Sequence, residues 1–360
     1  MIPLLTALIA GTAQAADITA LPPAMRGDVG LAYGVKVVPD VLLEDDTVVG
    51  RRRAIDHTIT YSGTIGLTDI FAFEMALPHA ASSRVRFFDS YRMAYEPNQG
   101  TGTAVGTDLL TSNPEIHGTG LGGTRFSFAV TPFSEDTYAS RGDTITWLMR
   151  VGYQLPDKTN IWTFDGGDRG AMDGASGMVL ETAFSTTNRM SQPYMGLRYD
   201  KRMPVRMDIV DKNGDIAAKK VQIKPASTVS LTTGLEIELH KNHAFANGLG
   251  TSVSLDPYAR FAWRSAAEIP SGVYLPSVLT MTKNSLVLQG ETSEAWAGLG
   301  IKWRIIEYLD WKTTAEMGTP FAYKVEHPYE VSTGMGKLSW QVGTALTFRM
   351  RDPIFDPPAQ

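Results

Sequence analysis

Charged side chains recur at every second position of strand-like segments, and they are the residues of this chain with the clearest capacity for chemistry. Lys302 and Arg304, for example, alternate with Ile301, Trp303 and Ile305. Cations and carboxylates that share one face can bind, steer or exclude small polar solutes. The residues predicted to share that face and to line a pore are Lys36, Glu74, Arg125, Arg150, Glu181, Arg198, Asp200, Glu236, Glu238, Arg260, Arg264, Lys302, Arg304, Asp310, Lys312 and Glu316, and Asp56, Asp256 and Arg349 fall in the same phase.

The elements that must position these charges are β-strands. Neighbouring residues of a strand point to opposite faces, so the alternation places apolar side chains on one face and charged ones on the other. The same pattern returns between Leu338 and Met350. An apolar outer face around a charged inner face is what a β-barrel in a lipid bilayer requires. We therefore predict an all-β fold, a transmembrane antiparallel up-and-down β-barrel of about twelve strands.

The connections between the strands differ in length. The strands are predicted near Asp28–Val37, Ile55–Gly66, Ile70–Leu77, Thr124–Thr131, Thr144–Gln154, Met178–Ser185, Tyr194–Asp200, Val229–His240, Ser252–Arg264, Trp296–Ile305, Tyr308–Met317 and Leu338–Met350. Short turns such as Leu67–Asp69 alternate with long segments such as Pro39–Arg53 and Pro78–Gly123. Outer-membrane barrels have short periplasmic turns and long external loops. Both termini are therefore expected on the periplasmic side.

Five of the tryptophans support the same arrangement. Trp147, Trp303 and Trp311 fall in the outward phase near short turns, and Trp263 and Trp340 fall in the outward phase near long loops. Two levels of outward aromatic residues are typical of the girdles at the two membrane interfaces. The alternative is that these rings fill the core of a soluble protein.

Composition narrows the possible partners and compartments. The chain has 360 residues, 43% of them hydrophobic, no cysteine and a net charge of −5. The absence of cysteine excludes disulfides, thiol catalysis and cysteine metal sites. The acidic balance makes nucleic acid an unsuitable partner. No cofactor is expected, and the partners expected are outer-membrane lipid and a small-molecule solute.

The two ends of the chain are expected to lie outside the barrel. Residues Ile2–Ala10 form a short apolar run, and Ala13-Gln14-Ala15 is a small-x-small cleavage site, which together predict a secretion signal. A buried first helix is the alternative. Pro353, Pro357 and Pro358 cannot continue a paired strand. The predicted organisation is a signal peptide at 1–15, a periplasmic segment at 16–27, the barrel at 28–350 and a periplasmic tail at 351–360.

Two short motifs and the histidines have ordinary structural readings. Gly118–Gly123 matches G-x-G-x-x-G, but it precedes a strand, whereas a dinucleotide site needs it to open a helix. Asp211–Asp215 resembles the start of a calcium loop, yet Asn213-Gly214 favours a hairpin with arms at Val205–Val210 and Ile216–Ile223. The histidines do not form a metalloprotease motif, so no metal site is predicted.

A segment rich in arginine and aromatic residues, Arg84–Tyr95, belongs to one of the long connections. Phe87, Tyr91 and Tyr95 recur at every fourth residue, which is compatible with a short helix. Such a loop could fold inward and narrow the pore, or it could extend the wall outside the membrane. The residues that would form the constriction are Arg86, Phe87, Tyr91 and Arg92.

Two stretches resemble a known family. Gly66-Leu67-Thr68-Asp69, followed by Phe71, Phe73, Met75, Leu77 and Pro78, resembles the strand-turn-strand of Gram-negative outer-membrane barrels. Gly120–Arg125 resembles a strand opening of the transporters associated with the meta pathway of phenol degradation, with Gly123 where that class has Asp. The resemblance implies an outer-membrane pore or transporter for small, often apolar molecules.

The function expected from these observations is an outer-membrane channel or transporter for small solutes, and not an enzyme. The first alternative is a plugged structural or docking barrel whose loops or turns bind a partner protein. The second alternative is an outer-membrane enzyme that modifies lipid, which would need Ser and His together on one exposed face. The lumen separates the first two possibilities, because a water-filled path favours transport and interlocked ion pairs favour a plug.

Overall fold

The computed structural model describes residues 21–44, 47–88, 115–134, 145–156, 161–162, 174–188, 190–210, 216–242, 251–270, 286–306, 308–320, 324–326, 330–333 and 338–350. Within these ranges the regular secondary structure consists of β-strands. No helix in the described part of the chain is long and apolar enough to span a membrane. The predicted signal peptide and C-terminal tail lie outside the described residues and stay predictions.

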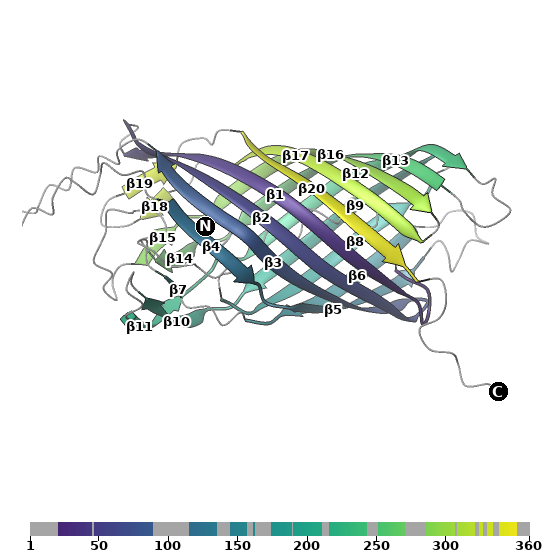
Figure 1. Ribbon diagram of the computed structural model, residues 1–360, viewed down its shortest axis with the longest axis horizontal. Helices are drawn as coiled ribbons and strands as arrows, with labels where there is room; N and C mark the ends of the chain where they lie inside the picture. Colours follow the sequence, from purple (N-terminus) through teal and green to yellow (C-terminus); the bar gives the residue numbers. More distant parts are fainter. Residues whose placement is uncertain are drawn as a thin grey trace, which may run out of the picture.

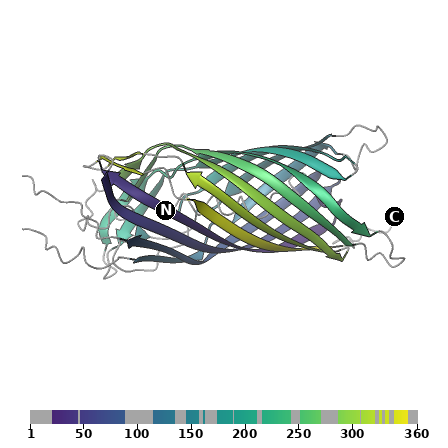
Figure 2. The same ribbon diagram turned by 90° about the horizontal axis from the view of Figure 1, so that it is seen from above.

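Twelve antiparallel strands close into a barrel, as the sequence predicted. The strands are β1 (Gly27–Glu44), β2 (Thr47–Thr68), β3 (Phe71–Phe88), β5 (Arg125–Phe133), β6 (Ile145–Gln154), β8 (Gly177–Thr186), β9 (Ser191–Arg202), β12 (Thr228–Asn242), β13 (Thr251–Arg264), β16 (Thr292–Ile306), β17 (Leu309–Pro320) and β20 (Ser339–Arg349). Each pairs with the next in this order, and β20 pairs with β1 from Asp28–Arg349 to Val37–Trp340. Figures 1 and 2 show the strands tilted around one axis. Because the last strand meets the first, the barrel has no free edge.

The wall of the barrel has an apolar outside and a polar inside. On β16, Leu299 and Ile301 are 47% and 50% exposed, whereas Lys302 between them is only 8% exposed. Leu299 and Ile301 therefore face outward and Lys302 faces inward, as the alternation predicts. Outward aromatic rings cluster near the short connections, where Trp147 stacks between Phe133 and Phe184. A continuous apolar exterior of this kind matches the hydrocarbon of a bilayer.

The first three strands are longer than predicted. Pro39–Arg53 was expected to be a long loop, but most of it belongs to β1 and β2, which pair as far as Glu44 and Thr47. Likewise β3 continues to Phe88. These extensions lack the apolar alternation of a membrane span because that pattern is needed only where lipid surrounds the wall. Backbone pairing does not depend on it, so the strands continue beyond the region that the sequence pattern marks.

Further short strands gather at one end of the barrel, which we call the long-connection end (Figure 1). One group extends the wall next to β3 and β1, and the other forms a separate three-stranded sheet. The wall group is β4 (Glu115–Leu121), β14 (Ala267–Pro270), β15 (Leu286–Gln289), β18 (Lys324–Glu326) and β19 (Glu330–Thr333), and the separate sheet is β7 (Ile161–Trp162), β10 (Val205–Val210) and β11 (Ile216–Ile223). The antiparallel pairing of β10 with β11 confirms the predicted hairpin arms. Residues 211–215 between them lie outside the described part.

At the opposite, short-connection end, the chain before β1 turns back into the barrel. Arg26 N donates to Pro23 O at 3.1 Å, and Met25 adopts a positive φ of 60° in this turn. Met25 N donates to Gly66 O at 2.7 Å, which attaches the turn to β2. Leu21 then packs against an interior apolar cluster that includes Leu148. Part of the segment predicted to lie in the periplasm therefore enters the mouth of the barrel.

Candidate functional site in the barrel interior

The candidate site is the inner face of the barrel wall, where the alternation places the charged residues. Nine of the residues predicted to line a pore are buried inside the wall, namely Lys36, Glu181, Arg198, Arg260, Arg264, Lys302, Asp310, Lys312 and Glu316. The others, Glu74, Arg125, Arg150, Asp200, Glu236, Glu238 and Arg304, are half-buried. The side chains are packed closely enough that Lys36, Asp256 and Glu316 are at most 2% exposed. The interior at this level is therefore filled largely by the protein's own polar side chains.

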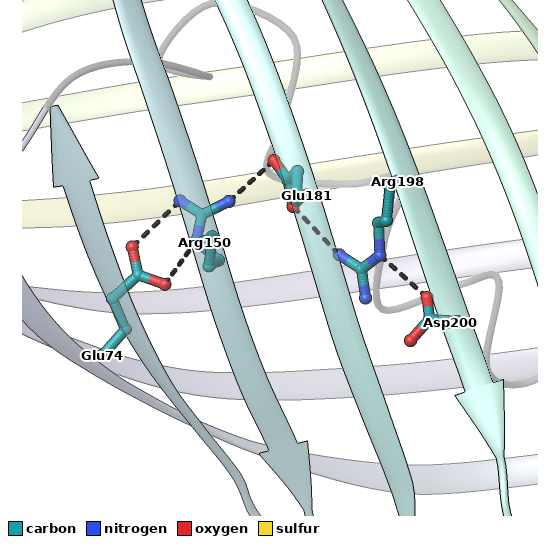
Figure 3. Close-up of polar contacts among 5 residues, drawn as sticks. All are labelled: Glu74, Arg150, Glu181, Arg198 and Asp200. Carbon is teal, nitrogen blue, oxygen red and sulfur yellow. Dashed lines mark hydrogen bonds and ion pairs between the residues drawn. The ribbon is translucent and has the colours of Figure 1, made fainter. Parts of the chain in front are cut away.

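One wall carries a ladder of ion pairs, drawn in Figure 3 and called here the ion-pair ladder. Arg150 of β6, Glu181 of β8 and Arg198 of β9 are direct neighbours in the strand register. Arg150 Nη1 donates to Glu181 Oε1 at 2.7 Å, and Arg198 Nη1 lies 3.7 Å from Glu181 Oε2. The ladder continues at both ends, with Arg150 Nε 2.6 Å from Glu74 Oε2 and Arg198 Nε 2.8 Å from Asp200 Oδ2.

The ladder satisfies its own charges. The Arg150 guanidinium contacts two carboxylates, and both Glu181 oxygens face an arginine. Bidentate arginine–carboxylate pairs fix the geometry of both partners more firmly than single contacts do. Removing one member of such a buried set leaves an uncompensated charge, which is strongly destabilising. The ladder is therefore suited to holding this wall rigid.

A second arrangement uses aromatic rings that cross glycines. Tyr194, Gly234, Tyr258, Gly298 and Glu316 are successive partners in one register row across β9, β12, β13, β16 and β17. A Cβ on Gly234 would collide with the Tyr194 ring, and one on Gly298 would collide with the Tyr258 ring. The missing side chains thus leave room for each tyrosine to lie across the neighbouring strand.

The two tyrosine hydroxyls reach carboxylates beyond those glycines. Tyr194 Oη donates to Asp256 Oδ1 at 2.9 Å, and Tyr258 Oη donates to Glu316 Oε1 at 2.8 Å. Arg260 Nη2 donates to the other oxygen of Glu316 at 2.7 Å. Each of these two hydrogen bonds crosses one intervening strand. The tyrosines therefore link β9 to β13 and β13 to β17 on the inner face of the barrel.

Trp296 is also inside the barrel, over Gly318 of β17. Lys36 Nζ lies 4.9 Å and the Arg260 guanidinium carbon 5.2 Å from the ring centroid. These distances are within the range of cation–π attraction. The indole Nε1 donates to Glu294 Oε2 at 3.1 Å, and Glu294 also pairs with Arg264 at 3.0 Å.

The prediction named charged residues and missed these interior aromatics. Tyr194, Tyr258 and Trp296 occupy the inward phase of their strands, as Arg198, Arg260 and Lys302 do. The two-residue alternation could therefore have identified these aromatic residues as inward-facing, just as it identified the charged residues. The predicted outward tryptophans are different residues, and among them Trp303, Trp311 and Trp340 are exposed on the outer wall.

A clamp of three charges lies toward the short-connection end. Asp310 Oδ1 accepts from Arg304 Nε at 3.0 Å, and Asp310 Oδ2 accepts from Arg349 Nη2 at 2.6 Å. Both arginines are more exposed than Asp310, so this clamp is wetter than the ladder. It joins β16, β17 and β20, near the closing seam between β20 and β1.

The predicted constriction segment is only partly described. Arg86 and Phe87 belong to β3, paired with Arg53 and Arg52 of β2, and not to a loop or short helix. Arg86 has backbone partners on both sides, Arg53 of β2 and Glu115 of β4, so this described part of the segment extends the barrel wall. Arg86 is exposed. Tyr91 and Arg92 lie outside the described residues.

The described ranges contain no group of three or more His, Asp or Glu side chains arranged to hold a metal ion.

Comparison with solved structures identifies the fold. An outer-membrane channel from Pseudomonas putida F1 is similar over 93% of this chain and 98% of its own length, with 11% sequence identity and a TM-score of 0.52. A FadL homologue from Pseudomonas aeruginosa is similar over 94% of each chain, with 9% identity and a TM-score of 0.43, which is too weak to carry an argument. No family model and no curated protein matches the chain, so the resemblance to the phenol-pathway transporters has no support at the sequence level. The fold is that of an outer-membrane β-barrel.

Proposed function

We propose that the protein is an outer-membrane channel that passes small solutes along the charged inner face of its barrel. The observation that carries this proposal is the reversal of polarity across the wall, with Leu299 and Ile301 exposed outside and Lys302 buried inside. A soluble barrel has no need of an apolar exterior. The long-connection end would face the cell exterior, with both termini in the periplasm.

The small exposure of the interior side chains supports a narrow path and not a wide pore. Barrels with sixteen or more strands enclose a water-filled lumen, whereas about eight strands leave room only for side chains. Twelve strands with a packed interior fall between these cases. The solute class that suits such a path is a small molecule that exchanges hydrogen bonds with the wall.

Conductance of the purified protein in planar bilayers tests the proposal. We expect discrete steps of small conductance, and a change in their size when Asp310→Asn weakens the clamp at the short-connection end. Insertion should be checked independently by heat-modifiable migration on a gel. A correctly folded, inserted protein that never conducts would contradict the proposal.

The second candidate is a plugged structural or docking barrel, which the ion-pair ladder and the buried tyrosine bridges favour. In that case the wild type and Asp310→Asn would both be silent in the bilayer. The lipid-modifying enzyme has no comparable support, because no hydrogen bond joins a histidine to a serine among the described residues. His57 on the outer wall is instead hydrogen-bonded to Tyr33.

A further inference from the structure

The inner face of β20, β1 and β2 carries a contiguous set of buried polar side chains without ion-pair partners among the described residues. Single nitrogen atoms without a hydrogen bond also occur elsewhere inside the barrel, for example in Arg260 and Arg264, but those side chains form ion pairs. The residues concerned are Lys36, Asp56, Thr58, Ser339 and Gln341, called here the unpaired cluster. Each is at most 3% exposed. Within the described residues, Lys36 Nζ, Asp56 Oδ2, Thr58 Oγ1, Ser339 Oγ and both amide atoms of Gln341 have no hydrogen-bond partner.

The register brings these residues together on one wall. Gln341, Lys36 and Asp56 are successive partners across β20, β1 and β2. Ser339 and Thr58 are each two residues along the same strand from Gln341 and Asp56, and therefore lie on the same face. The cluster is thus contiguous and not a scatter of isolated atoms.

The ammonium and the carboxylate in the cluster are neighbours but do not pair with each other. Lys36 extends toward Trp296, with Nζ 4.9 Å from the ring centroid. Asp56 Oδ1 instead accepts a hydrogen bond from Ser83 on the other side, in β3. Among the described residues no ion pair joins Lys36 to Asp56, although their backbones are opposite in the register. A positive and a negative group are therefore held apart, with the Gln341 amide on the same row.

Buried polar atoms without partners are costly, and the cost is greater for charged groups. The ion-pair ladder avoids it by internal pairing, but the unpaired cluster does not. Ordered water could satisfy the atoms one at a time. A single molecule with a carboxylate and an ammonium group would satisfy both charges at once and gain charge-assisted hydrogen bonds.

We propose that the unpaired cluster is a binding site for a small zwitterionic solute of the amino-acid type. Its carboxylate would contact Lys36, its ammonium group would contact Asp56, and Gln341 and Ser339 would complete the hydrogen bonds. An anion alone would meet Asp56 and a cation alone would meet Lys36, so each would be disfavoured by one member of the cluster. This inference rests on the proposed channel function, because the solute must reach the interior.

Titration calorimetry of the full-length folded protein in detergent tests the site directly. The probes are the ω-amino acids glycine, β-alanine, 4-aminobutyrate and 5-aminopentanoate, whose charge separation increases along the series. Glycerol, acetate and ethylammonium serve as uncharged, anionic and cationic comparators. We expect at least one zwitterion to bind about tenfold or more tightly than every comparator, which is the loss expected when one charge-assisted contact is missing.

Variants locate that binding. Lys36→Met and Asp56→Asn should each weaken the preferred zwitterion about tenfold or more, whereas Lys201→Met, which removes an exposed outward charge, should not change it. Similar weak binding of every probe, or tight binding that survives both interior substitutions, would overturn the site in favour of ordered water only. If a variant fails to fold, the comparison of zwitterion with single-charge probes on the wild type still decides. A protein that conducts in bilayers but shows no preference would lose this site and keep its channel function.

Discussion

The two sides of the barrel interior treat buried charge in opposite ways. On the wall from β3 to β9, Arg150, Glu181 and Arg198 satisfy one another in the ion-pair ladder. On the wall from β20 to β2, Lys36 and Asp56 are register neighbours that do not pair. The first arrangement holds the wall rigid and leaves little hydrogen-bonding capacity for a solute. The second leaves that capacity available, which is why charge content alone does not locate a binding site.

Removing the centre of the ladder should give the largest effect. Glu181→Leu leaves two buried arginines with fewer partners, and we expect the free energy of unfolding to fall by about 3–5 kcal/mol. Urea unfolding followed by tryptophan fluorescence measures it. Glu268→Ala is the control, because Lys224 and Glu268 form a pair that is largely exposed and should contribute less than about 1 kcal/mol. Equal effects of the two changes would show that the ladder is not a stabilising unit.

Both walls depend on the apolar exterior, which outward substitutions test next. Leu299→Arg or Ile301→Arg places a charge among lipid chains and should destabilise the protein by about 2–4 kcal/mol near the midplane. Lys302→Gln, one residue away and inward, should cost far less. Unfolding from liposomes gives both values. A larger loss for Lys302→Gln would invert the assignment of inside and outside.

The hydrogen bonds of Tyr194 and Tyr258 to Asp256 and Glu316 depend on the missing side chains of the glycines that the rings cross, so adding one methyl group there should disrupt them. Gly234→Ala places a Cβ against the Tyr194 ring and should disrupt the bond to Asp256, at a cost of about 1–3 kcal/mol. Gly63→Ala is the matched control on β2, since nothing lies within 4 Å of its added Cβ. If both glycines tolerate alanine equally in the same unfolding assay, the ring does not need to lie across the strand.

The smallest effect is expected at the unpaired cluster. Lys36→Met removes a buried charge that has no hydrogen-bond partner among the described residues, so stability should change by less than about 1 kcal/mol, or increase. Glu181→Leu, by contrast, is expected to lower the free energy of unfolding. A loss of several kcal/mol, measured by the same urea titration, would mean that Lys36 acts as a structural cation for Trp296.

Local sequence patterns are sufficient to predict much of the barrel. The alternation around Leu299 and Lys302 determines which face of a strand meets lipid, because side chains point to opposite sides with a period of two. That rule also underlay the prediction of about twelve strands, which the closed barrel confirms. Asn213-Gly214 identified the arms of the β10–β11 hairpin, because this dipeptide favours a tight turn.

The partnerships inside the barrel were decided by the tertiary structure alone. Arg150 forms an ion pair with Glu181, whereas Lys36 forms none with Asp56. Both outcomes depend on strand register and stagger, which the two-residue alternation does not specify. The continuation of β1 and β2 beyond the apolar pattern depends on backbone pairing, to which most side chains are indifferent. The return of Leu21 into the barrel depends on a turn attached to Gly66, about forty residues away in the chain. The sequence determines the two faces of the wall because that information is local, whereas pairing across the interior is a property of the closed barrel.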